Sequence, residues 1–399
     1  MSILYTKLVR LTTPIFQENA MQLYVHIPYC RQKCRYCDFA SYPCQEETMS
    51  SYVDALLKEA STVSRLIHQP LTTGFIGGGT PSILPAPLLD RLLNGLQNTF
   101  DFTADMEFTT EANPGTLTAD WLHTAMAGGV NRLSMGMQAV QPDLLQTLGR
   151  IHTHEEVVES VHLAHREGIH SLNLDLMFGL PGQTPDMWRE TLQAALALEP
   201  EHLSCYGLIP EVGTPLFADL QSGRLTLPDE DDERRMYDDA LELLARHGYQ
   251  QYEISNFARP GAECRHNIGY WQQQPYIGLG ASAASMVTDM EGELRMSNPP
   301  SIADYIHMVQ HRQWAKREFV RVTQEDARFE TLMLGLRMTQ GVSEADFLQR
   351  HRVPLESYRG TKLKSLQEQG LLEHTNGFWR LTRRGMDVQN AILVELMDD

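Results

Sequence analysis

The sequence predicts an α/β protein with six parallel strands, followed by a smaller helical domain of winged-helix-like order. Two observations predict this fold class. Six short β-rich segments alternate with helix-like segments over the first half of the chain, and from about residue 321 amphipathic helices replace that alternation. Strands that alternate with helices form parallel sheets with helical crossovers. In parallel α/β barrels the functional site lies at the carboxyl ends of the strands, so the candidate residues are expected there.

The six β-rich segments are predicted as strands at residues 22–28, 74–82, 106–114, 131–138, 171–181 and 202–210. Between the last two, TPDMWRETLQAALAL predicts a helix over 184–198. Thr184 is its expected N-cap, Pro185 stands at the first helical position, and Trp188 and Leu192 share one apolar face.

The chain is divided into four predicted segments, at residues 1–20, 21–226, 227–320 and 321–399. Strand-like QLYVHIP follows directly after Met21, so residues 1–20 are interpreted as an N-terminal extension from an upstream start codon. The segment 227–320 opens with an acidic helix over 227–249, with Pro228 in its first turn and Gly248 at its end. In the last segment, FETLMLGLRM and YRGTKLKSLQEQGLL predict helices, and GFWRLTRRG predicts a short strand and turn.

Composition indicates a globular chain that does not bind nucleic acid. The 399 residues are 42% hydrophobic, which suffices for a buried core. Lys+Arg 33 against Asp+Glu 51 give a net charge of -18, and residues 321–399 carry 11 Lys+Arg and 12 Asp+Glu, without the basic stripe of a DNA reader. No apolar run approaches the roughly 20 residues of a membrane span. We therefore expect a cytoplasmic protein.

Three of the six cysteines, Cys30, Cys34 and Cys37, stand at tight spacing. Disulfides are not expected in a cytosolic chain of this length. Buried apolar packing is disfavoured because charged residues such as Arg31 and Lys33 interleave the cysteines. Structural zinc takes four ligands, often as two separated pairs, and no second pair follows. Three thiolates suit a four-iron four-sulfur cluster with one open iron, and Cys44 is the rival candidate for the fourth ligand.

The pattern C-x-x-x-C-x-aromatic-C, with Tyr36 as the aromatic residue, resembles the cluster loop of radical S-adenosylmethionine (SAM) enzymes. The resemblance implies an open six-stranded parallel (β/α)6 barrel over 21–226, with a [4Fe-4S] cluster held by the three cysteines. In that family the amino and carboxylate groups of SAM bind the open iron, and the reduced cluster cleaves SAM to methionine and a 5'-deoxyadenosyl radical. It also implies a low-potential electron donor such as flavodoxin or ferredoxin.

Polar and glycine residues collect at the predicted strand ends. A Gly-rich loop over 77–79 ends the second strand, Glu111 and Gln138 end the third and fourth, and Asp175 lies within the fifth. Taken singly, the glycines could form an ordinary turn and each polar residue could simply be solvated at a strand end. Their occurrence on successive strands favours a shared site. By resemblance, these positions contact SAM: Tyr24, Tyr36, Gly79, Thr80, Glu111, Gln138, Arg150, Asp175 and Gly207. Among them, Arg150 is expected to pair with the SAM carboxylate.

The resemblance extends over essentially the whole chain and narrows to the oxygen-independent coproporphyrinogen III oxidase-like branch. The oxidases carry a further cysteine where this sequence has Phe39. The segment HNIGYW supplies His266, Asn267, Tyr270 and Trp271 in the pattern of the HemW-type heme chaperones. This group is implied to bind heme and to deliver it to heme-requiring proteins, some of them at the inner face of the membrane. The alternatives are a radical SAM oxidase that decarboxylates coproporphyrinogen, and a cluster protein that does not use SAM.

Candidate heme contacts are expected in the segment 227–320. The imidazole of His266 is a candidate iron ligand, with a structural hydrogen-bonded histidine as the alternative. Cys264 is a second candidate or a buried thiol, and Cys205 is expected in the core. The domain at 321–399 is interpreted as a cover for the porphyrin site or as a docking module for partners.

Overall fold

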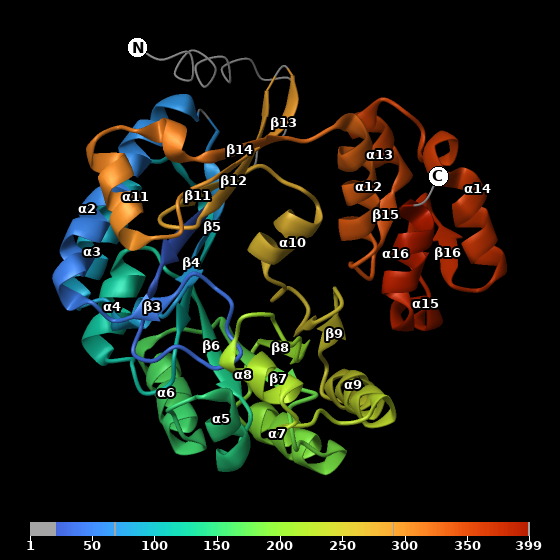
Figure 1. The fold of residues 1–399 in the computed structure, drawn as a ribbon, viewed down its shortest axis with the longest axis horizontal. Helices are drawn as coiled ribbons and strands as arrows, with labels where there is room; N and C mark the ends of the chain where they lie inside the picture. Colours follow the sequence, from blue (N-terminus) through green and yellow to red (C-terminus); the bar gives the residue numbers. More distant parts are fainter. Residues whose placement is uncertain (1–20, 68, 290, 398–399) are drawn as a thin grey trace.

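The structure is a computed structural model that describes residues 21–67, 69–289 and 291–397. The predicted extension at 1–20 lies outside the described residues. Figure 1 shows a curved sheet with helices on its outer side and a separate group of C-terminal helices beside it.

Six parallel strands form the centre of the main sheet, as predicted: β1 (Met21–Ile27), β4 (Leu71–Gly78), β5 (Phe102–Ala112), β6 (Arg132–Gln138), β7 (Leu172–Phe178) and β8 (His202–Gly207). They lie side by side in chain order and pair in parallel. Because β1 pairs with β4 and β11, and β8 with β7 and β10, the two ends of the series do not meet. The barrel is therefore open.

The sheet continues beyond both ends of this series, which the sequence did not predict. Beyond β1 lie β11 (Tyr276–Leu279), β12 (Ala284–Asp289), β13 (Gly292–Ser297) and β14 (Glu318–Arg321); beyond β8 lie β10 (Asn256–Ala258) and β9 (Gln250–Gln251). Only β11 among these pairs in parallel, with β1. The predicted segment 227–320 thus contributes strands to the same sheet.

Helices cover the outer face of the sheet: α2 (Glu46–Val63), α3 (Ala86–Gln97), α4 (Ala119–Ala127), α6 (His154–Glu167), α7 (Pro185–Ala197), α9 (Glu230–Arg246) and α11 (Ile302–Gln310). The short helices α5 (Pro142–Leu148) and α8 (Pro215–Gln221) pack instead in a separate apolar cluster with residues at the carboxyl ends of β6, β7 and β8. Successive side chains of β6 point alternately to the outer and the inner face of the sheet. Leu133 and Met135 belong to the apolar core, whereas the hydroxyl of Ser134 donates to Asp175 on β7. The concave face, which is the interior of the barrel, is therefore polar along this strand.

Two predicted helix starts can be compared with the structure. Helix α7 begins as predicted, with the Thr184 side chain accepting from the backbone of Met187 and Pro185 at the first position. The first-turn position predicted for Pro228 is wrong. Helix α9 begins at Glu230, and the Asp229 side chain caps it by accepting from the backbone of Asp232. An Asp satisfies a free N–H at a helix start, which Pro cannot do.

The C-terminal domain is a small helical unit with its own apolar core. It contains α12 (Gln324–Gly335), β15 (Val342–Ser343), α13 (Glu344–His351), α14 (Leu355–Glu368), β16 (Leu372–Thr375), β17 (Phe378–Leu381), α15 (Arg383–Asp387) and α16 (Gln389–Met397). The three strands form an antiparallel sheet in the order β15-β17-β16. Three helices followed by a β-hairpin give the winged-helix-like order that the sequence predicts.

Candidate functional site

The cysteine loop leaves the carboxyl end of β1 and is closed at its base by backbone pairing. The two-residue strands β2 (Tyr29–Cys30) and β3 (Tyr42–Pro43) pair in parallel, and the N–H of Cys44 donates to the carbonyl of Cys30 at 2.8 Å. A ring nitrogen of His26 on β1 lies 2.9 Å from the carbonyl oxygen of Ala40 in the loop. The loop that presents Cys34 and Cys37 is therefore anchored to the barrel on both sides.

The three predicted cluster cysteines each contact a polar group, which belongs to the barrel for Cys30 and Cys34 and to the loop itself for Cys37. The Thr80 hydroxyl donates to Cys30 Sγ at 3.6 Å, Arg150 Nη1 donates to Cys34 Sγ at 3.5 Å, and Cys37 Sγ lies 3.9 Å from Ser41 Oγ. Burial raises the pKa of Cys30 and of Cys37, and repulsion from the neighbouring thiolates raises it further. The three sulfurs are thus close enough to interact. Cys44 is exposed.

The chemistry of this donor set fits a [4Fe-4S] cluster better than a single ion. Within the described part of the chain, no three His, Cys, Asp or Glu side chains converge to hold one metal ion. A cluster does not need three side chains that converge on one ion, because each thiolate binds a different iron. When bound, a cluster with three protein thiolates supplies an open iron for a small ligand and an electron for its cleavage.

Arg150 connects the cysteine loop with the ends of two strands. Its Nη2 donates to Asn113 Oδ1 at 2.9 Å and to the carbonyl of Gly136 at 2.7 Å, while Nη1 reaches Cys34. Asn113 in turn donates to the Thr80 hydroxyl at 2.8 Å. This network fixes a guanidinium beside the cysteine loop, where it can hold a carboxylate.

Two carboxyl groups lie inside the barrel near this network. Burial, and then the charge of Asp175, raise the pKa of Glu111 to about 8, although the Gly78 N–H opposes this by donating at 3.0 Å. Burial also raises the pKa of Asp175, which accepts hydrogen bonds from Asn173 at 2.8 Å and Ser134 at 3.2 Å. Partly desolvated carboxyls of this kind are suited to a cationic or hydroxyl-bearing ligand.

Backbone geometry at two strand ends also points to a site. A Cβ on Gly79 would stand 2.6 Å from the carbonyl oxygen of Tyr29 and 2.7 Å from that of Ile27, so only glycine fits there. Gln138, at the end of β6, has a φ of 65°, which is uncommon for a residue with a side chain. Such strained positions occur often where a chain contacts a ligand.

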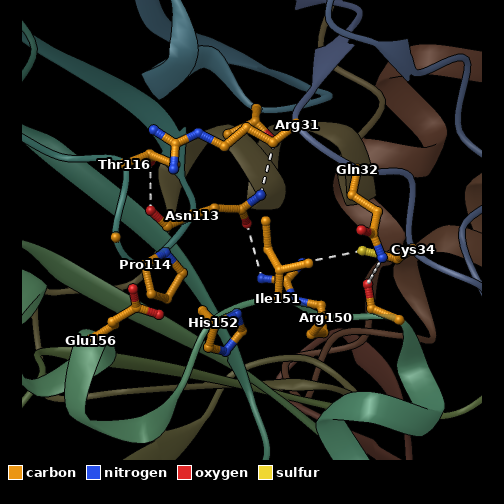
Figure 2. Close-up of a pocket in the computed structure, with 13 residues that line it drawn as sticks. Arg31, Gln32, Cys34, Asn113, Pro114, Thr116, Arg150, Ile151, His152 and Glu156 are labelled. Carbon is orange, nitrogen blue, oxygen red and sulfur yellow. Dashed lines mark hydrogen bonds between the residues drawn. The ribbon is translucent and has the colours of Figure 1, made fainter.

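A cavity of about 150 Å³ opens beside the cysteine loop (Figure 2). Its lining comes from the cysteine loop, the strand ends and the start of α6: Arg31, Gln32, Cys34, Thr80, Asn113, Pro114, Gly115, Thr116, Gly149, Arg150, Ile151, His152 and Glu156. His152 is buried beside Arg150, and burial, then that positive charge, lower its pKa to about 4. The cavity is therefore lined by a neutral imidazole and a fixed cation next to Cys34.

His266 lies in a different part of the barrel interior, on the short helix α10 (Arg265–Trp271). It is buried, and both ring nitrogens are in contact: Nδ1 lies 2.8 Å from the Thr73 hydroxyl and Nε2 lies 3.1 Å from the Tyr270 hydroxyl. Thr73 is in the first half of β4, away from the strand end that carries Gly79. Burial, then the charge of Arg132, lower the pKa of His266 to about 3, so the ring is neutral.

Helix α10 is held at both ends by charged side chains from different domains. Glu107 on β5 accepts from the backbone N–H groups of Arg265 and His266 at 3.0 Å each. At the other end, Arg350 of α13 donates to the carbonyls of Gln272 and Gln273 at 3.2 and 3.0 Å. A carboxylate at a helix N-terminus and a guanidinium at its C-terminus both match the helix dipole.

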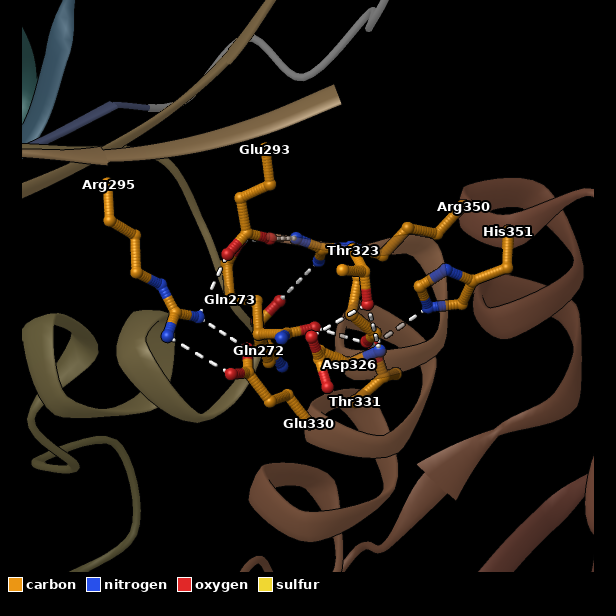
Figure 3. A network of polar contacts seen from close by, with 11 residues as sticks. Gln272, Gln273, Glu293, Arg295, Thr323, Asp326, Glu330, Thr331, Arg350 and His351 are labelled. Atoms are coloured by element: carbon orange, nitrogen blue, oxygen red, sulfur yellow. Dashed lines mark hydrogen bonds and ion pairs between the residues drawn. The ribbon is translucent and has the colours of Figure 1, made fainter. Parts of the chain in front are cut away.

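The same contact region joins the two domains (Figure 3). Arg295 of β13 forms ion pairs with Glu293 on its own strand and with Glu330 of α12, and Arg350 lies 3.8 Å from Glu293. Helix α10 therefore sits between the barrel strands and the C-terminal domain. A Cβ on Gly269 would collide with the side chain of Gln22, which shows how closely the helix approaches β1.

The structure thus brings most predicted site residues together and leaves one apart. Thr80 contacts Cys30, and Arg150 contacts Cys34. Electrostatic effects link Tyr36 with Arg150, Cys34, Cys37 and Asp175, and they link Glu111 with Asp175 and with Tyr24. Gly79, Gln138 and Gly207 lie at the ends of their strands. His266 lies apart on α10, and Cys264 and Cys205 are buried, as expected. Asn113 was not predicted as a site residue, although it stands two positions after Glu111 within the third predicted strand.

Comparison with known proteins assigns the class of protein. Residues 24–195 match the Radical SAM superfamily model and residues 322–388 match the HemN C-terminal domain model. A solved structure described as coproporphyrinogen III oxidase (HemN) from Escherichia coli, a radical SAM enzyme, has a TM-score of 0.82 and 24% identity, covering 98% of this chain and 93% of that one. The fold and the cysteine loop define a radical SAM protein.

Curated relatives identify the family within that class. The heme chaperone HemW of Bacillus subtilis (strain 168) is 38% identical over 92% of this chain and 97% of its own length. The heme chaperone HemW of Escherichia coli (strain K12) is 36% identical over 94% of this chain and 97% of its own length. The chain belongs to the HemW family. A [4Fe-4S] cluster and SAM are the cofactors that this radical SAM membership implies.

No helix in the described ranges has both the length and the apolar character needed to cross a membrane.

Proposed function

We propose that this chain is a heme chaperone, which binds heme together with a [4Fe-4S] cluster and SAM and hands the heme to acceptor proteins. The observation that carries the proposal is the similarity to proteins named heme chaperone HemW over nearly the full length of both chains. Phe39 supports it, because this exposed side chain stands where the oxidases have a further cysteine. The likeness to HemN concerns the fold, which an oxidase and a chaperone share.

Within this proposal, Cys30, Cys34 and Cys37 hold the cluster and the strand-end residues hold SAM. Arg150 orients the SAM carboxylate beside Cys34, and Glu111 and Asp175 receive its polar groups, with Tyr24, Tyr36, Gly79, Thr80, Gln138 and Gly207 completing the surroundings. The support is the hydrogen-bond network from Cys34 through Arg150 to Asn113 and Thr80. Asp175→Ala should weaken SAM binding measured anaerobically while the iron content stays unchanged. Unaltered SAM affinity would contradict the assignment.

His266 is proposed as the heme-iron ligand, through Nε2. That nitrogen lies 3.1 Å from the Tyr270 hydroxyl, so ligation requires the Tyr270 side chain to move away from it. Heme should titrate onto the reconstituted protein with a defined stoichiometry, and His266→Ala should alter the heme spectrum. His247→Ala is the matched control, because His247 is exposed at the end of α9. A spectrum that is the same in both variants would exclude His266 as the ligand.

A low-potential electron donor such as flavodoxin or ferredoxin completes the proposal as the reductant of the cluster. The acceptors are heme-requiring proteins, and delivery takes place in the cytoplasm, including the inner face of the membrane. A coproporphyrinogen III oxidase remains the second candidate, favoured by the common fold alone.

A further inference from the structure

Arg132 is a buried cation, and two of its three side-chain nitrogens have no hydrogen-bond partner among the described residues. It begins β6 and is 3% exposed, yet its Nε and Nη2 make no hydrogen bond to any described residue. A buried guanidinium is costly unless its N–H groups are paired. Arg132 is therefore in a position that calls for an anionic partner.

The nearby carboxyl groups are already engaged elsewhere. Glu107 accepts the two backbone N–H groups at the start of α10 and a contact from the Cys264 thiol at 3.6 Å. Asp175 accepts from Asn173 and Ser134. Both influence Arg132 electrostatically, but neither forms an ion pair with it within the described residues. Arg132 thus keeps free donor capacity next to two carboxyls.

A second unpaired donor lies directly beside Arg132. Thr109 on β5 is its partner in the parallel register between β5 and β6, so both side chains point to the same face of the sheet. Thr109 is fully buried and its hydroxyl also makes no hydrogen bond to a described residue. A guanidinium and a hydroxyl on adjacent strands are a suitable pair of donors for one carboxylate.

An aromatic surface occupies the neighbouring strands. Tyr24 stacks on Phe75 at 6.4 Å between ring centroids, Phe75 stacks on His266 at 5.3 Å, and Tyr270 meets His266 edge to face at 4.8 Å. The charge of Arg132 acts on this surface, because it lowers the pKa of His266, although burial lowers that pKa more. The interior therefore combines flat aromatic faces on β1, β4 and α10 with unpaired donors on β5 and β6.

We propose that Arg132 and Thr109 form a carboxylate-binding site inside the barrel, and that this site takes a propionate group of heme. The aromatic surface suits the face of a porphyrin, and the two donors suit the carboxylate at its edge. The assignment rests on the proposed function, because it places a second part of the same ligand near His266. The carboxylate of SAM is the competing source of the same chemistry.

The test compares heme with heme dimethyl ester, which lacks the propionate charges, on the reconstituted protein. The wild type should bind heme roughly tenfold to a hundredfold more tightly than the ester, as expected for a charge-assisted pair. Arg132→Met should bind the two equally, and Thr109→Val should reduce the preference several-fold. Arg246→Met is the matched control, because Arg246 is exposed on α9 and pairs with Glu242.

The outcomes separate the inference from the proposed function. A wild-type preference for heme that persists in Arg132→Met would overturn the site, and so would equal binding of heme and ester by the wild type. Weakened SAM binding in Arg132→Met with an unchanged heme preference would assign the site to SAM and overturn the inference. No heme binding by the wild type would contradict the proposed function itself. If Arg132→Met does not fold with its cluster, Thr109→Val decides the question, because it removes one hydroxyl only.

Discussion

Cys30, Cys34 and Cys37 differ from Cys44 in their environment as well as in their spacing. The sulfurs of the first three contact Thr80, Ser41 or Arg150, whereas Cys44 is exposed and takes part in the loop through its backbone N–H. Replacing any one of the three by Ala should abolish the intact cluster, because each thiolate holds a separate iron. Iron and sulfide content after anaerobic reconstitution measures this. Cys44→Ala is the control, and loss of the cluster in that variant would overturn the ligand assignment.

Glu111 should make the stability of the cluster-free protein depend on pH. Burial raises its pKa from 4.5 to about 8 in the folded state. Between those values the unfolded chain releases a proton that the folded chain retains, so stability falls as pH rises. In Glu111→Gln this carboxyl no longer titrates, so its contribution to the decrease in stability is absent. The free energy of unfolding of this variant, measured by urea denaturation, should therefore increase relative to that of the wild type as pH rises from about 4.5 to about 8. A difference that does not vary with pH would contradict the raised pKa.

Residue spacing and strand position allowed the cluster loop and the strand-end polar residues to be predicted. Cys34 and Arg150 are 116 positions apart, and their contact depends on the parallel order of the strands. The same rule that selected Glu111 would have selected Asn113. Nothing local in the sequence indicates that Arg132 is buried, or that its Nε and Nη2 have no hydrogen-bond partner among the described residues. Both properties arise from the strands and the helix packed around it.

Helix α10 is too short to be stable by itself and depends on the groups at its two ends. Glu107 of the barrel binds its first N–H groups and Arg350 of the C-terminal domain binds the carbonyls that follow it. A helix of seven residues is below the length at which isolated helices persist in water. The position of His266 is therefore set jointly by both domains.

Arg350→Ala should loosen α10 without unfolding the barrel. The variant loses two hydrogen bonds to carbonyls and the contact with Glu293, about 1–3 kcal/mol in total. Hydrogen exchange of the amides in Arg265–Trp271 should become faster, while that of β6 stays unchanged. The control is Arg246→Ala, which removes an exposed pair on α9. Equal protection of α10 in the two variants would refute the role of Arg350.

The parallel strands of the barrel were predicted well, and the strands that flank them were not. The limits of β6 and β7 differ from the predicted ones by at most three residues, because their alternation and strand-end residues are local signals. β11 has four residues and β9 has two, and they are strands because they pair with distant segments. The sequence predicted the HNIGYW segment as a candidate site, but its burial under Gln22 and Glu107 depends on tertiary packing.

At the scale of the whole molecule, the contact between the two domains combines ion pairs with hydrogen bonds, such as the one from the Thr339 N–H to the carbonyl of Tyr252. Four ion pairs between described residues cross the contact: Arg295–Glu330, Arg350–Glu293, Arg234–Asp387 and Arg383–Asp238. Their side chains are partly exposed, so salt screens them, and at about 1 M the screening length is about 3 Å. High salt should therefore speed hydrogen exchange in α10 and leave β6 and β7 unaffected. A uniform response across both regions would argue against an ionic contact.

The central claim is that this chain carries heme and does not convert coproporphyrinogen to protoporphyrinogen. One anaerobically reconstituted preparation, supplied with SAM and a reductant, tests it directly when heme binding and coproporphyrinogen decarboxylation are assayed in parallel. We expect heme bound at a defined stoichiometry and no decarboxylated product. Protoporphyrinogen formed over many turnovers per cluster would contradict the claim and assign the protein to the oxidases.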